Sequence, residues 1–267
     1  MQPVENIKSK YIVLTSGRTG SNLLRSLLNS HPEMVCDAEL FLGNERFEAT
    51  QDPFLHVEKN KLLNDTKTAY GYMLSLYQIN QMKTVGGASR FLLQMQKDGW
   101  KIIYLYRSNI PMQALSFLKA RKTKIYHLLI IHELPKGKIN LSLSEVFKTI
   151  YALKYYRRRE ERLLQNIPHI SIDYMRDLAD TAMHQNTVNT ICRYLNIDFA
   201  AISTDSIRVS NSQVNEDFMH GDRLLSAAKL FSFLVTPLVI MSEAMHYYLD
   251  GNKPKTAADS NRAANVL

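Results

Sequence analysis

A strand, a glycine-bearing turn and a helix follow one another at the start of the chain, and this order constrains the fold most. Residues 11–14 form a β-branched and aromatic run (Tyr-Ile-Val-Leu), which is typical of a buried strand. Gly17 and Gly20 follow, and four leucines at helical spacing come next: Leu23, Leu24, Leu27 and Leu28. The helix is predicted to stop at residues 29–32. Such a unit opens a parallel α/β sheet.

Further apolar segments continue this alternation along the chain. Strands are predicted over 69–76, 101–106 and 167–172, and helices over 110–121, 142–165, 181–195 and 223–248. Ser142 and Glu145 form a capping box at the start of the long central helix. The segment 251–267 is polar and alanine-rich, so we expect a flexible tail. The sequence therefore predicts one α/β domain over residues 1–250, with a central parallel sheet flanked by helices.

Composition limits the partners and the compartment. The 267 residues carry a formal net charge of +8, which favours an anionic partner. Cys36 and Cys192 are isolated thiols, as expected in a reducing compartment. The first ten residues have no apolar signal core, and the apolar stretch 230–241 is too short to span a bilayer and contains Pro237. We expect a cytoplasmic protein without a transmembrane segment.

The loop Ser16-Gly17-Arg18-Thr19-Gly20-Ser21-Asn22 is the strongest candidate for an anion site. Its glycines let the backbone approach a ligand closely, and amides at the start of the following helix favour negative charge. Arg18 adds a cationic fork, and Thr19 and Ser21 add hydroxyls. These groups suit a phosphate or phosphosulfate; an ordinary βα turn is the structural alternative.

The same loop does not fit a metal-dependent nucleotide hydrolase. Such an enzyme needs the pattern GxxxxGK(S/T), with a lysine for the terminal phosphates and a hydroxyl for Mg²⁺. The lysine is missing here, and no predicted strand ends in an obvious metal-binding aspartate. The histidines show no ligand spacing, so no metal site is predicted.

Five segments together resemble a known family. The loop Leu14–Leu24 resembles the 5′-phosphosulfate loop of sulfotransferases that use PAPS (3′-phosphoadenosine 5′-phosphosulfate), in the arginine form of tyrosylprotein sulfotransferases and a bacterial group. His31–Glu39 resembles the stretch that follows in the former, and Tyr104–Ser116 resembles the signature that holds the 3′-phosphate. Ala120–His127 is similar to a segment of the bacterial group, and Ile172–Leu178 to a strand-end segment. The resemblance implies a fold like that of P-loop nucleotide hydrolases.

The resemblance also implies roles for particular residues of the loop Leu14–Leu24 and of the segment Tyr104–Ser116. Contacts to the 5′-phosphosulfate would come from Gly17, Arg18, Thr19, Gly20, Ser21 and Asn22. Arg18 would also stabilise the leaving group. Arg107 and Ser116 would bind the 3′-phosphate. Their spacing is one residue longer than usual, so either the loop carries an extra residue or Ser108 shares the contact. The nucleotide cofactor would be PAPS, with PAP as product and no metal.

Sulfuryl transfer also needs a base for the acceptor proton. Glu39 stands where the family motif has its carboxylate, with Asp37 and Glu33 as alternatives. His127 is a candidate for the acceptor pocket; a surface histidine is the alternative. Strand 69–76 has Met73 where the family often has a lysine, so either a second cation comes from elsewhere or Arg18 acts alone.

The sequence thus favours an O-sulfotransferase that acts on a hydroxyl of a carbohydrate, glycolipid or small molecule. A protein that binds PAP or PAPS without transfer and a P-loop phosphotransferase are the alternatives. The run Arg157–Arg159 lies beside Glu160 and Glu161, which favours a solvated helix face over a docking patch for an acidic acceptor. No aromatic and basic motif indicates nucleic-acid binding. A homodimer is left open.

Overall fold

The computed structural model describes residues 7–41, 52–63, 67–81, 86–124, 138–203 and 218–250. Contacts divide the chain into two compact units, Met1–Ser108 with Leu163–Ser206 and Asn109–Arg162 with Ile207–Leu267. The first unit contains the sheet and the second is helical. The predicted tail at 251–267 lies outside the described residues, so the domain boundary at residue 250 stays a prediction.

The first unit is built on a five-stranded parallel sheet in the order β2-β3-β1-β4-β5. Its strands are β1 (Ser9–Thr15), β2 (Met34–Glu39), β3 (Ala69–Leu74), β4 (Trp100–Tyr106) and β5 (His169–Asp173). The predicted class, α/β with a central parallel sheet flanked by helices, is confirmed. All four predicted strands are present with shifted ends. The prediction missed β2 as a strand.

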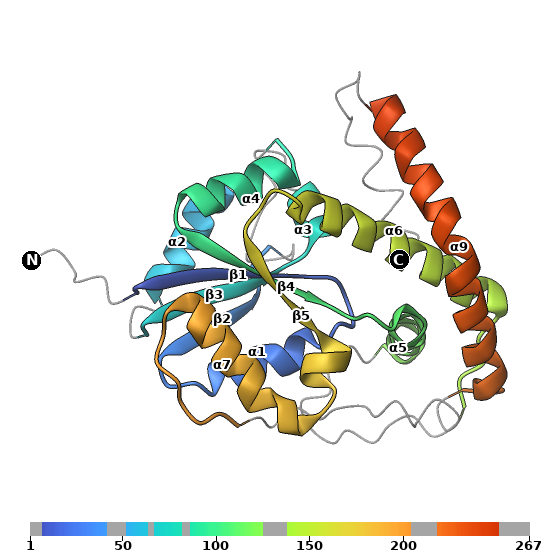
Figure 1. Ribbon diagram of the computed structural model, residues 1–267, viewed down its shortest axis with the longest axis horizontal. Coiled ribbons are helices and arrows are strands. Elements are labelled where there is room, and N and C mark those ends of the chain that lie inside the picture. The colour runs from blue at the N-terminus through green and yellow to red at the C-terminus, as the bar shows by residue number, and fades with distance from the viewer. Residues whose placement is uncertain are drawn as a thin grey trace, which may run out of the picture. The chain divides into compact units, whose positions relative to one another are not determined.

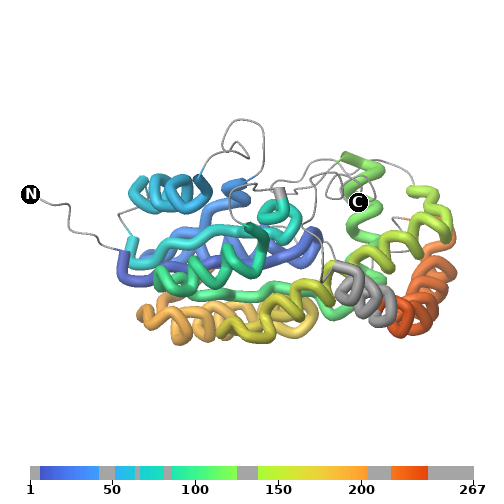
Figure 2. Tube along the Cα trace, turned by 90° about the horizontal axis from the view of Figure 1, so that it is seen from above, coloured from blue at the N-terminus to red at the C-terminus, as the bar shows by residue number. Residues whose placement is uncertain are grey.

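Helices cover both faces of this sheet (Figure 1). The two on one face are α1 (Ser21–Asn29) and α7 (His184–Leu195), and those on the other are α2 (Pro53–Leu63), α3 (Leu76–Gln81) and α4 (Ala88–Lys97). Figure 2 looks onto the second group and shows the strands lying side by side beneath it. The sequence analysis predicted α1 and most of α7, but not α2, α3 or α4. Residues 181–183 form a 3₁₀ turn before α7.

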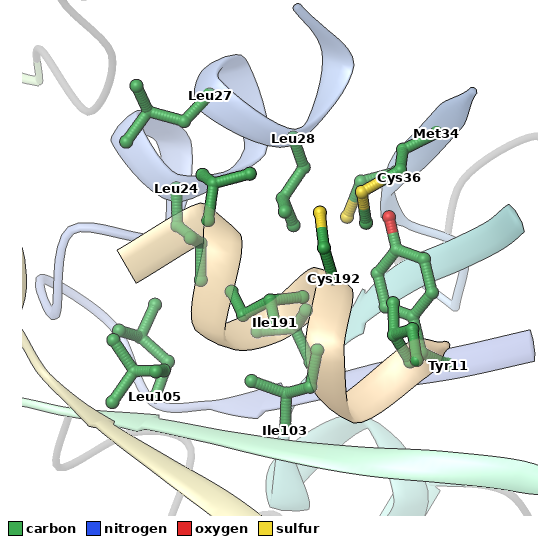
Figure 3. Close-up of a cluster of buried hydrophobic side chains, with 14 of the residues drawn as sticks. Tyr11, Leu24, Leu27, Leu28, Met34, Cys36, Ile103, Leu105, Ile191 and Cys192 are labelled. Atoms are coloured by element: carbon green, nitrogen blue, oxygen red, sulfur yellow. The ribbon is translucent and has the colours of Figure 1, made fainter. Parts of the chain in front are cut away.

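The apolar pattern explains why these elements pack. Residues 11–15 of β1 are all buried, as expected for a central strand that is covered on both faces. The predicted leucine stripe of α1 is its buried face. In Figure 3, leucines of α1 and Ile191 of α7 meet above β1 and β4. A second apolar cluster packs on the other face, so the sheet is covered on both sides.

Because every strand is parallel, the carboxyl ends lie along one edge of the sheet. Thr15, Glu39, Leu74, Tyr106 and Asp173 end the five strands there. Ligands of open α/β sheets bind outside this edge. The loops that follow these residues therefore form the candidate site.

The second unit packs α5 (Ile110–Thr123), most of α6 (Leu143–Leu164) and α9 (Gly221–Asp250) around its own apolar core. Phe147 of α6 stacks on Phe231 of α9 at 4.1 Å between ring centroids. Among the described residues, no helix combines the length and the apolar character of a membrane span.

The three arginines at 157–159 contact other side chains of their own helix, α6. Nε of Arg157 lies 3.1 Å from Glu161, an Nη of Arg158 lies 3.6 Å from the same carboxylate, and Cζ of Arg159 lies 5.8 Å from the centroid of the Tyr155 ring. The contacts of the three arginines fit the local pairing that the sequence favoured, but Glu160 is buried, so the solvated face does not include it. A docking role for an acidic acceptor gains no support from them.

The capping box at the start of α6 forms as predicted. The Ser142 amide donates to Oε2 of Glu145 at 3.0 Å, and the Glu145 amide donates to Oγ of Ser142 at 3.2 Å. Replacing Ser142 with alanine leaves the Glu145 amide without its acceptor. We expect the free energy of unfolding to fall by about 1 kcal/mol, measured by urea denaturation. Ser144→Ala, an exposed position in the same turn, is the control and should change stability little; equal effects would contradict a capping role.

Candidate functional site at the carboxyl edge of the sheet

In the loop after β1, the backbone adopts a left-handed conformation at both Arg18 and Gly20. Gly20 adopts φ +89° and directly precedes α1, so no side chain caps the first amides of that helix. Arg18 also adopts a positive φ, +65°, which is uncommon for a residue with a side chain. Gly17 is exposed and Arg18 half-buried. The loop thus offers helix amides and a guanidinium group to an anion at this edge.

The conformation of this loop is fixed from inside by Thr19. Its side chain is fully buried, and its hydroxyl donates to the Ser16 carbonyl at 2.9 Å and lies 2.6 Å from the hydroxyl of Thr15. With these bonds made, Thr19 serves to shape the loop, and only its amide remains suited to a ligand. Ser21 and Asn22 begin α1 and are half-buried. Their role in nucleotide binding stays a prediction.

Arg107 stands at the end of β4, the strand next to β1. It is only 7% exposed, and its Cζ lies 4.7 Å from the centroid of the Tyr174 ring, a cation–π contact. Burial lowers the pKa of Arg107, Tyr174 and Asp173 oppose that shift, and the positive charge of Arg18 adds to it. An arginine stays protonated in proteins, so both cations remain charged. The influence of Arg18 on this pKa indicates that both arginines lie in the same part of the carboxyl edge.

Tyr174 links these two features, and the sequence analysis gave it no role. Its ring lies against Gly20, where an added Cβ would come within 2.4 Å of Cδ2 of the tyrosine. The residue is buried in the single π-helical turn Tyr174–Leu178 that follows β5. One aromatic ring therefore touches the loop after β1 and the arginine after β4. The strand-end segment was noticed in the sequence, but the contact joins residues far apart in the chain.

Hydrogen bonds from β5 hold this arrangement. Oδ1 of Asp173 accepts from the Ser108 amide at 2.9 Å and from the Met175 amide at 3.1 Å. Asp177 in turn accepts from the Asp173 amide at 2.7 Å. The backbone that carries Arg107 is thus tied to the turn that carries Tyr174. The amide of Ser108 is used here, while its side chain is exposed.

Glu39 ends β2 at the same edge, opposite Met73 of β3. Burial raises the pKa of its carboxyl group, and a hydrogen bond from the Tyr77 side chain opposes that shift. A carboxylate whose pKa is raised toward neutrality is a better proton acceptor in water than one with the usual value. Its position and its environment both suit a base.

The two alternative carboxylates are less suitable. Asp37 lies two residues before the end of β2, farther from the carboxyl edge than Glu39, and accepts a hydrogen bond from the Tyr70 hydroxyl at 2.8 Å. Glu33 precedes β2, at the opposite edge of the sheet, and accepts from the Thr68 hydroxyl at 3.1 Å. Glu39 is therefore the best placed of the three residues that the sequence offered.

Three other predicted positions have different outcomes. Ser116 lies in α5, within the second compact unit, so its predicted contact to the 3′-phosphate stays a prediction. His127 lies outside the described residues. Met73 is 3% exposed and packs in the core between the sheet and α1. Whether a second cation replaces the lysine missing at Met73, or Arg18 acts alone, stays open.

The prediction that there is no metal site can be compared with the described residues only. Within the described parts of the chain, no group of three or more histidine, cysteine, aspartate or glutamate side chains could hold a metal ion.

Cys36 and Cys192 are buried in the core, and burial raises the pKa of the Cys36 thiol to about 12. A thiol with such a pKa is a poor nucleophile near neutral pH.

Comparisons with known proteins give distant similarities. No protein-family model matches the chain, and no curated protein sequence matches it. Among solved structures, a sulfotransferase from Alicyclobacillus acidocaldarius is similar at 12% identity and a TM-score of 0.44, covering 86% of this chain and 96% of its own. A sulfotransferase domain from the curacin biosynthetic pathway is similar at 15% identity and a TM-score of 0.46, covering 86% of this chain and 98% of its own.

Proposed function

We propose that the chain is a sulfotransferase that moves a sulfuryl group from PAPS to an acceptor hydroxyl of a carbohydrate, glycolipid or small molecule, in the cytoplasm. The observation that carries the proposal is the pair of guanidinium groups at the ends of the neighbouring strands β1 and β4. Arg107 is buried, the charge of Arg18 helps to lower its pKa, and its guanidinium group lies over the Tyr174 ring, which also contacts the loop after β1. A buried arginine and a half-buried arginine at one edge of the sheet favour a ligand with two anionic groups.

The residues suit the donor in distinct ways. The amides at the start of α1 and the Arg18 side chain would hold the 5′-phosphosulfate, and Arg107 would hold the 3′-phosphate by a bidentate fork. The donor supplies an activated sulfuryl group whose leaving group is a phosphate. As the sulfur–oxygen bond to that phosphate breaks, negative charge grows on the departing oxygen, and Arg18 stabilises it. No metal is needed for this step.

Glu39 would act as the general base that accepts the proton of the acceptor hydroxyl. An acceptor hydroxyl placed in line with the breaking bond donates its proton to the Glu39 carboxylate as its oxygen bonds to sulfur. The products are the sulfated acceptor, PAP and a protonated Glu39, which loses its proton to water. Because Glu39 must be ionised, the rate is expected to rise with pH through its raised pKa.

Ligand preference tests this proposal most directly. Calorimetry should show that PAP binds more tightly than AMP, since only PAP carries a 3′-phosphate. Tighter binding of ATP in the presence of Mg²⁺ would favour a phosphotransferase. Binding of PAP without transfer to any acceptor from a panel of sugars, glycolipids and phenols would favour a protein that only binds the nucleotide.

Replacing Arg107 with glutamine should weaken PAP binding about 10- to 100-fold, because charge-assisted hydrogen bonds contribute about 1.5–3 kcal/mol. AMP, which lacks the 3′-phosphate, should bind the variant as it binds the wild type. Arg193→Gln is a control: this exposed arginine is in α7, over the Phe199 ring. An equal loss of PAP and AMP affinity in Arg107→Gln would place the residue at a different part of the nucleotide.

A further inference from the structure

Helix α9 of the second unit carries a row of large apolar side chains that are exposed. Leu230, Phe233, Leu234 and Leu238 are 62%, 78%, 58% and 59% exposed, and Pro237 is exposed between them. Counted from Leu230, these residues follow at three, four, seven and eight positions, so all five lie along one side of the helix. We call them the α9 apolar face. Exposed apolar side chains that gather in this way mark an interaction surface more often than scattered ones do.

The opposite side of α9 is packed within its own unit. Val235 and Val239 are buried in the apolar core that α9 shares with α5 and α6, and Phe231 stacks on Phe147 of α6 (Figure 1). This packing fixes which side of the helix points outward. A helix held in this way would lie flat on a surface and insert only the α9 apolar face.

Cations border the α9 apolar face. Arg223 and Lys229 are exposed on α9 itself, and Lys154 of α6 donates to the Thr236 hydroxyl at 2.6 Å. Lys229 lies seven residues before Thr236, about two helical turns, so Lys229 and Lys154 lie along the same edge of the face. Among the described side chains of α9, Asp222 is the acidic one. The surroundings of the face are therefore basic.

The positive charge of the chain is concentrated in the same unit. The second unit contains 18 lysines and arginines against 10 aspartates and glutamates, whereas the first unit contains 15 of each. The formal charge of +8 thus belongs to the helical unit, and the sheet unit is neutral. A basic unit with an exposed apolar face is complementary to a surface that is both negatively charged and apolar beneath.

We propose that the α9 apolar face docks on an anionic lipid surface, with its bordering cations against the headgroups. This docking is independent of the proposed sulfuryl transfer. Phospholipid headgroups supply the negative charge, and the acyl chains take up the apolar side chains. A nucleic acid would meet the cations but leave the leucines and the phenylalanine in water. A second copy of the chain would bring two units of the same charge together.

Co-sedimentation of the full chain with vesicles tests the docking. With about 30% phosphatidylserine in phosphatidylcholine, we expect binding at least about 10-fold tighter than with phosphatidylcholine alone, because each cation near a negative surface adds attraction. Raising the salt concentration should weaken this binding. No binding to the anionic vesicles would overturn the proposal, and equal binding to both kinds of vesicle would exclude the part played by the cations.

A paired substitution tests whether the α9 apolar face is the part that binds. Phe233→Ser with Leu234→Ser should weaken binding to the anionic vesicles about 10- to 100-fold, because two large apolar side chains no longer insert. The matched control is Leu62→Ser with Leu63→Ser, two adjacent leucines of α2 in the neutral unit that are 60% and 83% exposed. The control should bind as the wild type does. Equal losses in both pairs, or no loss in the α9 pair, would overturn the proposal.

Two further measurements complete the test. Circular dichroism during heating should show the same melting temperature for both paired variants and the wild type, since the replaced side chains are exposed. Sedimentation equilibrium without lipid separates docking on lipid from self-association. A wild-type dimer that the α9 pair converts to a monomer would assign the face to contacts between copies of the chain, against the proposal.

Discussion

Glu39→Gln is expected to lower the rate of sulfuryl transfer by about 10²- to 10⁴-fold, the usual contribution of a general base. Glutamine has nearly the same shape, but it cannot take a proton from the acceptor. The change also removes a half-buried charge, so it should not destabilise the fold. Single-turnover measurements with saturating PAPS would separate this loss from any change in product release.

The affinity for PAP shows whether the loss belongs to the chemical step. It should be unchanged in Glu39→Gln, since the proposed nucleotide contacts come from the loops after β1 and β4. Glu33→Gln, at the opposite edge of the sheet, is the matched control and should retain the wild-type rate. A variant of Glu39 that transfers at nearly the wild-type rate would shift the role of base to another group.

The largest expected loss of stability comes from Gly71→Ala. Tyr11 of β1 lies directly beside Gly71 of β3, and its ring crosses that strand so that the hydroxyl donates to the Val35 carbonyl of β2 at 2.9 Å. A Cβ at position 71 would lie 2.2 Å from the nearest ring carbon. Tyr11 is fully buried, so its ring has no free space to move into. We expect the free energy of unfolding to fall by about 3 kcal/mol, measured by urea denaturation.

A second substitution tests the cause of that loss. Tyr11→Leu removes the ring that meets the added methyl group, so in the double variant the loss caused by Gly71→Ala should be smaller than in the wild-type background. Gly87→Ala is a useful comparison, because its added Cβ would meet open space and only its φ of +104° disfavours alanine. Its effect should be smaller. Additive losses in the double variant would show that the ring is not the obstacle.

The fold was predictable where local patterns are strong. The buried run of β1, the leucine stripe of α1 and the capping box of α6 all depend on neighbours within a few residues, and each is present. Strand β2 was missed because residues 34–39 mix apolar and acidic side chains, and as an edge strand it is only partly buried. Helix α2 was missed because its buried positions, Pro53, Val57 and Lys61, include a proline and a lysine.

The candidate site was predictable only in part. Motif positions gave Arg18, Arg107 and Glu39, and the parallel sheet brings the ends of their strands to one edge. The motifs could not give Tyr174, because it acts through contacts between segments that only folding brings together. An aromatic residue at a strand end was the available signal for it.

The contact between Gly20 and the Tyr174 ring has a consequence for how this chain can diverge. A side chain at position 20 needs a smaller residue at position 174, yet a smaller residue at 174 alone leaves Arg107 without its aromatic support. A smaller residue at 174 would relieve the clash but neither the positive φ at position 20 nor the lost support of Arg107. Both positions are therefore expected to resist change, alone or together.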